Sequence, residues 1–375
     1  MQFRDLKTQY QRLKPQMDQA VTEVMTAANF ISGNQVKELE QELAEYVGVK
    51  HCVTCGSGTD ALTLALKALN IGAGDAVFVP DFTFFASGET PALEGATPVF
   101  VDVEKETFNL SAESLRQAVE KVKEEGKLVP KAVIAVDLFG LPADYPKIRK
   151  ITDQYGMYLI EDGAQGFGGK IGEKKACSFG DISATSFFPA KPLGCYGDGG
   201  AVFTDNDEWA SVMRSLCVHG KGSNKYDNVR IGLNSRLDTI QAAVLKVKLQ
   251  AFREYELEEV NRAAVYYTEK LKDLVEVPVV PEGFYSSWAQ YSVLLKDREE
   301  RDGLQSYLKE HDIPSMIYYP KMMHEQVAFD GYDCKVSEMP NAEELCNRVL
   351  ALPMHPYLEE NDMDEVVEKI RTFMG

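Results

Sequence analysis

Short, almost entirely apolar segments recur along the first half of the chain and constrain its fold more than any other feature. Most of them alternate with stretches in which apolar residues recur at helical spacing, such as residues 112–125 and 145–155. A strand that is apolar on both faces must be covered on both sides, as in a parallel sheet between two helix layers. The pattern therefore predicts an α/β fold with a large, mostly parallel sheet. The predicted strands are residues 50–54, 76–80, 98–102, 132–137, 157–160, 183–187 and 200–204.

The pattern changes near residue 250. Residues 241–269 form one long amphipathic helical stretch, followed by an isolated predicted strand at 290–295 and a helix at 298–311. A length of 375 residues also exceeds the usual size of one domain. We therefore expect a large α/β domain over residues 1–250, with an N-terminal helical segment, and a smaller α+β domain over residues 251–375.

Charge and cysteine content exclude several classes of partner. The chain has 58 acidic residues against 40 Lys and Arg, a net charge of −18, which disfavours binding to nucleic acid or to an anionic membrane. The start is polar and charged, and no apolar run approaches the ~20 residues of a membrane span, so we expect a cytoplasmic protein. Cys52 and Cys55 form a C-x-x-C at the end of a predicted strand. No second pair or His cluster follows at zinc spacing, so reduced thiols are favoured and no metal site is predicted.

Three segments that could carry chemistry follow predicted strands, at the end of the sheet where α/β proteins bind ligands. The first contains Gly56, Gly58 and Thr59 and opens a strongly helical run. Glycines let the backbone approach a ligand closely, and a helix N-terminus offers free N–H groups to an anion. A phosphate cradle and a tight strand-to-helix connection explain this segment equally well. It is neither the dinucleotide G-x-G-x-x-G nor a P-loop.

The second segment ends an apolar strand on Glu161 and Asp162, with Gln165 close behind. Alternation directs only one of the two carboxylates toward a given face. That carboxylate could be a metal ligand, a general base, the partner of a cationic ring nitrogen or a structural cap, and nothing nearby supplies a second metal ligand.

The third segment places Lys191 between two prolines in an apolar stretch. A partly desolvated lysine loses proton affinity and can act as a nucleophilic amine, although an isolated lysine is ordinarily a surface residue. Ser186, five residues earlier, could bind a phosphate of the same ligand. A phosphate, a ring nitrogen that needs a carboxylate and an aldehyde that needs an amine together describe pyridoxal phosphate (PLP).

The run SFFPAKPLGCYGDGGA, with GSGTDA, IEDGAQ and NSRLD, resembles the nucleotide-sugar aminotransferases of PLP fold type I. The resemblance extends from FRDLKTQY near the start to LPMHPYL near the end. It implies a seven-stranded, mostly parallel sheet, a PLP cofactor, L-glutamate as amino donor and a nucleotide sugar as acceptor. On the matching positions, Lys191 would hold the cofactor's aldehyde and move protons. Asp162 would keep the ring nitrogen protonated, and Gln165 would contact the ring hydroxyl.

The resemblance also implies roles for residues outside these three. Gly58, Thr59 and Ser186 would bind the cofactor phosphate, and Phe84 in DFTFFAS would stack on the ring. Asn234 in NSRLD would reach the phosphate in the neighbouring subunit, which implies a homodimer with active sites at its interface.

Three further positions have open interpretations. Arg236 and Tyr319 are candidates for the nucleotide-sugar pocket, but Arg236 could instead pair with Asp238, and Tyr319 could be a core residue. His219 in VHGKG could contact a ligand, although a hydrogen-bonded structural histidine is the favoured interpretation. Where the family usually has Ala after the catalytic Asp, this chain has Gly163, which would leave the second face of the ring less covered.

The form FFPAKPLGCYGDGGA looks closest to enzymes that aminate C-3 of a UDP-linked 3-keto sugar, including those that make 2,3-diamino-uronic acids for surface polysaccharide. A uronate needs a cation, for which Arg236 is the candidate. A 4-keto or dTDP-linked sugar is the alternative. A sugar dehydratase of this fold would have His at position 191, and a dinucleotide oxidoreductase would need G-x-G-x-x-G. A non-catalytic nucleotide-sugar-binding or sensor protein remains as a rival from another class.

Overall fold

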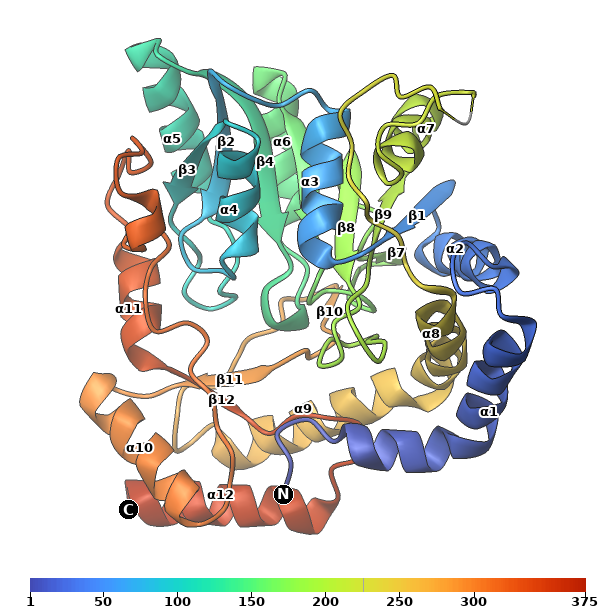
Figure 1. Ribbon diagram of the computed structural model, residues 1–375. Helices are drawn as coiled ribbons and strands as arrows, with labels where there is room; N and C mark the ends of the chain where they lie inside the picture. Colours follow the sequence, from blue (N-terminus) through green and yellow to red (C-terminus); the bar gives the residue numbers. More distant parts are fainter. Residues whose placement is uncertain (225) are drawn as a thin grey trace.

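The computed structural model describes residues 1–224 and 226–375 and is built around a seven-stranded sheet with the order β1-β9-β8-β5-β4-β2-β3 (Figure 1). Neighbouring strands from β3 to β8 are parallel, whereas β9 is antiparallel to both β8 and β1. The predicted fold class, a large and mostly parallel sheet, is confirmed. The strands are β1 (His51–Cys55), β2 (Asp75–Pro80), β3 (Thr97–Val101), β4 (Val129–Val136), β5 (Tyr158–Asp162), β8 (Ile182–Ser186) and β9 (Gly200–Thr204).

Helices cover both faces of this sheet, as its apolar strands require. In β2, Val77 and Val79 join the core under α3 and α4, whereas Ala76 and Phe78 join the core under α5 and α6. Figure 1 shows α3 and α4 in front of the sheet. The N-terminal half contains α1 (Leu6–Ala27), α2 (Asn34–Val47), α3 (Gly58–Ala68), α4 (Ala86–Leu93), α5 (Ala112–Glu125), the short η1 (Leu138–Gly140), α6 (Tyr145–Tyr155) and α7 (Asp207–Leu216).

The predicted long helix over residues 241–269 consists of three consecutive pieces. These are α8 (Thr239–Ala251), a five-residue π-helical stretch η2 (Phe252–Glu256) and α9 (Leu257–Leu271). Through them the chain passes from the large sheet to the C-terminal elements, most of which lie at the bottom of Figure 1 with both termini. The domain boundary near residue 250 stays a prediction.

The C-terminal elements contain a second sheet that corrects one expectation. The strand predicted at 290–295 is β11 (Tyr291–Leu294), and it is not isolated, because β12 (Val349–Leu352) pairs with it antiparallel. The partner lies more than fifty residues further on and was not predicted. The other C-terminal elements are α10 (Arg298–Glu310), η3 (Val327–Phe329), α11 (Pro340–Arg348) and α12 (Glu360–Met374); a small third sheet joins β6 (Lys170–Ile171), β7 (Lys174–Lys175) and β10 (Phe284–Tyr285).

The seven cysteines are free and buried. Cys52 and Cys55 join core clusters on opposite faces of β1, and burial raises the pKa of both thiols. The C-x-x-C is therefore a pair of structural thiols. Among the residues that the structure describes, no helix is both long and apolar enough to cross a bilayer, and no three His, Cys, Asp or Glu side chains are grouped to hold a metal ion.

Candidate active site

Asp162 is the carboxylate that β5 presents at its carboxyl end. It accepts hydrogen bonds from Ser87 Oγ at 2.7 Å and from the backbone N–H of Ala164 at 3.2 Å. Burial raises its pKa, and these bonds and the charge of Lys191 offset the rise only in part. Among the described residues, no cation lies within ion-pair distance of this carboxylate. A buried acid with only neutral donors is suited to receive a cationic group from a ligand.

Glu161 is excluded from that role by its own partners. Its side chain points to the opposite face of β5, where it accepts hydrogen bonds from Ser183 Oγ and Phe179 N, both at 2.7 Å. This buried carboxylate therefore ties together the segment that follows β5 and the next strand.

Lys191 lies in the turn that follows β8, and its backbone N–H donates to the carbonyl of Phe188 at 2.9 Å. Among the described residues its Nζ has no hydrogen-bond or ion-pair partner, and it lies 6.0 Å from the centre of the Phe84 ring. Burial lowers the pKa of this amine, and the charge of Asp162 offsets the effect in part. A lysine with a lowered pKa and no partner is suited to act as a nucleophile or a base.

The N-terminus of α3 lies directly against the end of β8. Ser57 caps the helix by accepting from Asp60 N at 3.0 Å. The N–H groups of Gly58 and Thr59 have no acceptor among the described residues. A Cβ on Gly58 would lie only 2.7 Å from Ser186 Cβ, so glycine is needed for this close approach. Two N–H groups therefore lie beside the Ser186 hydroxyl at a helix N-terminus, where a phosphate binds favourably, and Thr59 is in the first turn of that helix.

Gln165, Tyr319 and Phe84 line the remaining side. The buried amide of Gln165 accepts from Phe139 N at 2.8 Å and donates to the Tyr319 hydroxyl at 3.3 Å. The rings of Tyr319 and Phe84 are 6.4 Å apart, and 53% of the Phe84 side chain is exposed. Tyr319 is half-buried at the edge of the core, so the structure brings it to the site from the C-terminal part of the chain.

The family model for DegT/DnrJ/EryC1/StrS aminotransferases matches residues 11–371. A UDP-2-acetamido-2-deoxy-3-oxo-D-glucuronate aminotransferase from Pseudomonas aeruginosa is 40% identical over 360 residues, 96% of either chain. A "pleiotropic regulatory protein" from Geobacillus stearothermophilus is also 40% identical, over 98% of this chain and 97% of its own. The crystal structure of a DegT/DnrJ/EryC1/StrS aminotransferase from Brucella abortus is 50% identical, covers 100% of both chains and has a TM-score of 0.97. This chain belongs to the DegT/DnrJ/EryC1/StrS aminotransferase family.

The family uses PLP, and the residues of this aminotransferase fit that cofactor. The buried Asp162 lacks a cationic partner, which a protonated ring nitrogen would provide. Lys191 offers an amine without a partner, and the cradle of Gly58, Thr59 and Ser186 offers donors for a phosphate. When bound, PLP supplies an aldehyde that takes up an amino group and a ring that delocalises the electron pair left on the substrate carbon.

The segment 234–236 of the aminotransferase packs against its own α3. Ser235 Oγ donates to Asp60 at 2.6 Å and accepts from Gly56 N at 2.8 Å. Asn234 is exposed, and its side-chain oxygen accepts a hydrogen bond from Arg236. The alternative of an ion pair between Arg236 and Asp238 is wrong, since no such contact is present. The reach of Asn234 into a neighbouring subunit stays a prediction.

His219 and Gly163 differ from expectation. The ring of His219 is exposed and has no hydrogen bond to a described residue; instead its backbone N–H donates to Leu233 O at 2.8 Å, and its carbonyl accepts from Asn228. A Cβ on Gly163 would lie 2.7 Å from Cys177 Sγ and 3.3 Å from Ala184 O. A side chain at position 163 would therefore point into the packed interior, and the missing methyl does not uncover the ring.

Ser87 and the side chains that hold the lysine turn were not predicted from the sequence. Ser87 lies in the first turn of α4, three residues after Phe84, and a lone hydroxyl near Thr83 and Thr90 gave no signal of its role. Arg4 donates to the carbonyls of Lys191 and Pro192, and Lys248 donates to that of Gly194. Contacts over such separations leave no local pattern in the sequence.

Proposed function

We propose that this aminotransferase moves the amino group of L-glutamate to C-3 of a UDP-linked 2-acetamido-3-keto sugar, the uronate in particular, in surface polysaccharide biosynthesis. The observation that carries the proposal is the Lys191 amine, which has a lowered pKa and, among the described residues, no hydrogen-bond or ion-pair partner, and whose charge interacts with that of the buried Asp162. The name of the Pseudomonas aeruginosa relative supports the uridine nucleotide, the 3-oxo position and the uronate.

The side chains divide the work as follows. When PLP is bound, Lys191 Nζ would hold its aldehyde carbon, and as a free amine Nζ would take the proton from the α-carbon of the donor. Burial lowers the pKa of this amine, which increases its unprotonated share, as a base requires. Asp162 would stabilise the positive ring nitrogen of the cofactor, and the amide of Gln165, oriented by Phe139, would contact its ring hydroxyl.

Three residues are proposed to hold the acceptor sugar. Tyr319 contacts Gln165, so it borders both cofactor and substrate. Arg236 is the proposed partner of the sugar carboxylate, because one bond to Asn234 leaves further guanidinium donors available. His219 is a weaker candidate, on an exposed loop whose backbone is fixed by hydrogen bonds.

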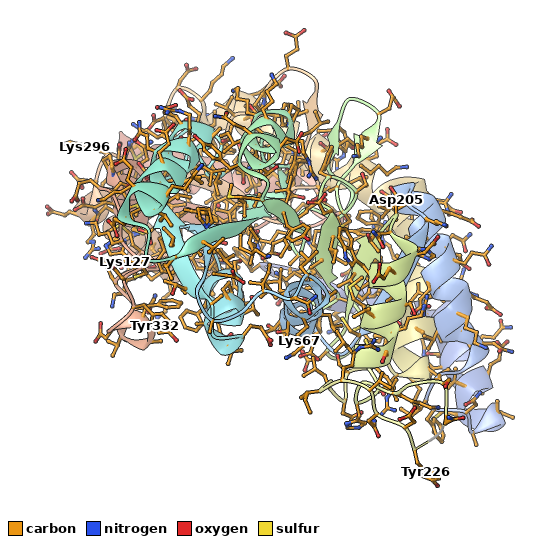
Figure 2. The ribbon with its side chains drawn as sticks, turned by 90° about the horizontal axis from the view of Figure 1, so that it is seen from above. Lys67, Lys127, Asp205, Tyr226, Lys296 and Tyr332 are labelled. Carbon is orange, nitrogen blue, oxygen red and sulfur yellow. The ribbon has the colours of Figure 1, made fainter. Side chains whose placement is uncertain are left out.

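The proposal includes a homodimer in which Asn234 of each subunit reaches the cofactor phosphate of the other. The loop before α8 supports this, because it exposes large apolar side chains: 88% of Tyr226 and 87% of Ile231 are accessible. Figure 2 shows Tyr226 at the outer edge of the molecule. Size-exclusion chromatography with light scattering tests the dimer, and a monomer at micromolar concentration contradicts it.

A regulatory protein without catalysis is the second candidate, and the name of the Geobacillus stearothermophilus relative favours it. The two candidates differ in their response to glutamate. The visible absorbance of the PLP-loaded protein should bleach with L-glutamate and return with a UDP-linked 3-keto-uronate. If the absorbance returns only with the non-acidic sugar, with a 4-keto sugar or with a dTDP sugar, then that sugar is the acceptor. Visible absorbance that never responds to glutamate would refute the transaminase and favour the regulatory protein.

A further inference from the structure

The turn that carries Lys191 is held from behind by two cationic side chains from distant segments. Arg4, just before α1, donates to the carbonyl of Lys191 at 3.0 Å and lies 3.5 Å from that of Pro192. Lys248 in α8 donates to the carbonyl of Gly194 at 2.7 Å. Within the turn the backbone N–H of Lys191 already bonds to Phe188, so the two cations complete the hydrogen bonding on the carbonyl side.

A buried cation is costly, which argues against chance placement of Lys248. Only 1% of Lys248 is exposed, and no carboxylate lies within ion-pair distance of it among the described residues. The nearby carboxylate, Glu256, is itself buried and accepts from Gln9 Nε2 at 2.8 Å and from the Tyr357 hydroxyl. One carboxylate for two cations leaves positive charge, which the peptide carbonyls of the turn stabilise together with the Tyr196 ring, 4.4 Å from Lys248 Nζ.

The same contacts join the two ends of the chain to the site. The carbonyl of Phe3 accepts from Met354 N at 3.3 Å, and the Phe3 ring lies 6.2 Å from that of Tyr318, the neighbour of Tyr319. The segment FRDL (residues 3–6) therefore contacts three others: LPMHPYL (residues 352–358), the loop that carries Tyr318 and Tyr319, and the lysine turn. These two motifs mark the limits of the family resemblance, and neither contributes a side chain to the site described above.

We propose that Arg4 and Lys248 are positioning residues, which fix the main chain of the turn and thereby the place of Lys191 Nζ near the Phe84 ring. The inference rests on the proposed role of Lys191. A 1 Å displacement of a reacting group can cost about 100-fold in rate. A loosened turn therefore slows proton transfer by Lys191 while leaving the glutamate contacts in place.

The test compares four variants of the PLP-loaded enzyme. Lys248→Met and Arg4→Met remove the two donors. Two variants are the matched controls. Lys246→Met changes a lysine on the same helix, whose ion pairs to Glu38 and Glu42 lie outside the site. Arg12→Met changes an arginine that stacks on the Tyr357 ring. The readouts are the single-turnover rate of bleaching by glutamate, the KM for glutamate, and the pH at which the visible absorbance of the lysine-bound cofactor changes.

We expect a rate loss of about 10- to 100-fold for each donor variant, with KM changed less than about two-fold and a shifted pH midpoint. Arg4→Lys should recover part of the rate. If both donor variants match their controls in bleaching rate and in the pH at which the visible absorbance changes, the inference is wrong. If Lys248→Met does not fold, the Arg4 pair decides alone. Visible absorbance and turnover retained in Lys191→Ala would instead refute the proposed function, so the two failures are distinguishable.

Discussion

Replacement of Gly163 by alanine tests how tightly the segment after Asp162 is packed. The new Cβ would lie 2.7 Å from Cys177 Sγ, well inside the 3.4 Å at which ordinary contacts begin. Neither partner can retreat easily. The N–H of Gly163 donates to Ala184 O at 2.8 Å and its carbonyl accepts from Thr185 Oγ1 at 3.0 Å, while Cys177 is fully buried with its backbone bonded to Glu161.

The expected cost is that of an overpacked core, about 1–3 kcal/mol. The unfolding entropy is about 2.1 cal/mol/K per residue, so a chain of this length should lose about 1–4 °C in its unfolding midpoint. Midpoints must be compared at fixed protein and PLP concentration, since ligands and oligomerisation shift them. Gly72→Ala is the control: its Cβ would meet nothing nearer than Glu94 O at 3.5 Å, and its cost should stay within about 0.5 kcal/mol.

A double-mutant cycle identifies the cause. Cys177→Ala alone should cost about 1 kcal/mol through the lost Sγ, and in that background Gly163→Ala should cost little, because the clashing atom is gone. Differential scanning calorimetry of the four proteins gives the coupling. Additivity within about 0.5 kcal/mol, or an unchanged midpoint for Gly163→Ala, would refute the packing argument.

Three further substitutions test the site and its surroundings. Asp162→Asn should keep the fold but slow the glutamate half-reaction by at least about 100-fold in stopped-flow absorbance, because a neutral amide cannot stabilise a positive ring nitrogen. Tyr319→Phe removes one acceptor of Gln165 while the bond from Phe139 stays, so kcat/KM should fall only about two- to five-fold in steady-state assays. Burial first, then the charge of Arg4, lowers the pKa of His355 to about 4 from 6.5. The unfolded chain then binds more protons between these pH values, so stability falls by up to about 3 kcal/mol as pH drops through that window, and chemical denaturation of His355→Gln should show a shallower fall.

The fold was predictable where burial alone determines a segment's pattern. The strands of the large sheet lie between two helix layers, so their apolar runs were visible in the sequence, and each prediction falls within a few residues of the observed strand. The partner of β11 was not predictable in this way. Pairing of Tyr291–Leu294 with Val349–Leu352 depends on how the intervening helices pack, and no local pattern records it.

The same distinction applies to the site. Asp162, Lys191 and the Gly58 turn all follow strands, so the rule that ligands bind at strand carboxyl ends brought them together before any coordinates. The choice between Glu161 and Asp162 needed the resemblance, since alternation alone leaves it open. Arg4 and Lys248 donate to backbone carbonyls, which every residue has. No residue type in the lysine turn therefore predicted these two contacts.

The two titratable groups at the centre of the site are shifted in opposite directions by the same burial. Desolvation raises the pKa of Asp162 and lowers that of Lys191, so without a ligand it favours the neutral form of both. A pyridine nitrogen beside Asp162 changes this balance, because its proton and the carboxylate's negative charge stabilise each other across one hydrogen bond. The ionic state of Asp162 is then a property of the loaded site. Lys191 has no such partner among the described residues. Its lowered pKa therefore leaves it able both to take up a proton and to give one back. The same desolvation thus makes Asp162 ready to receive a cationic group and makes Lys191 a better nucleophile and base.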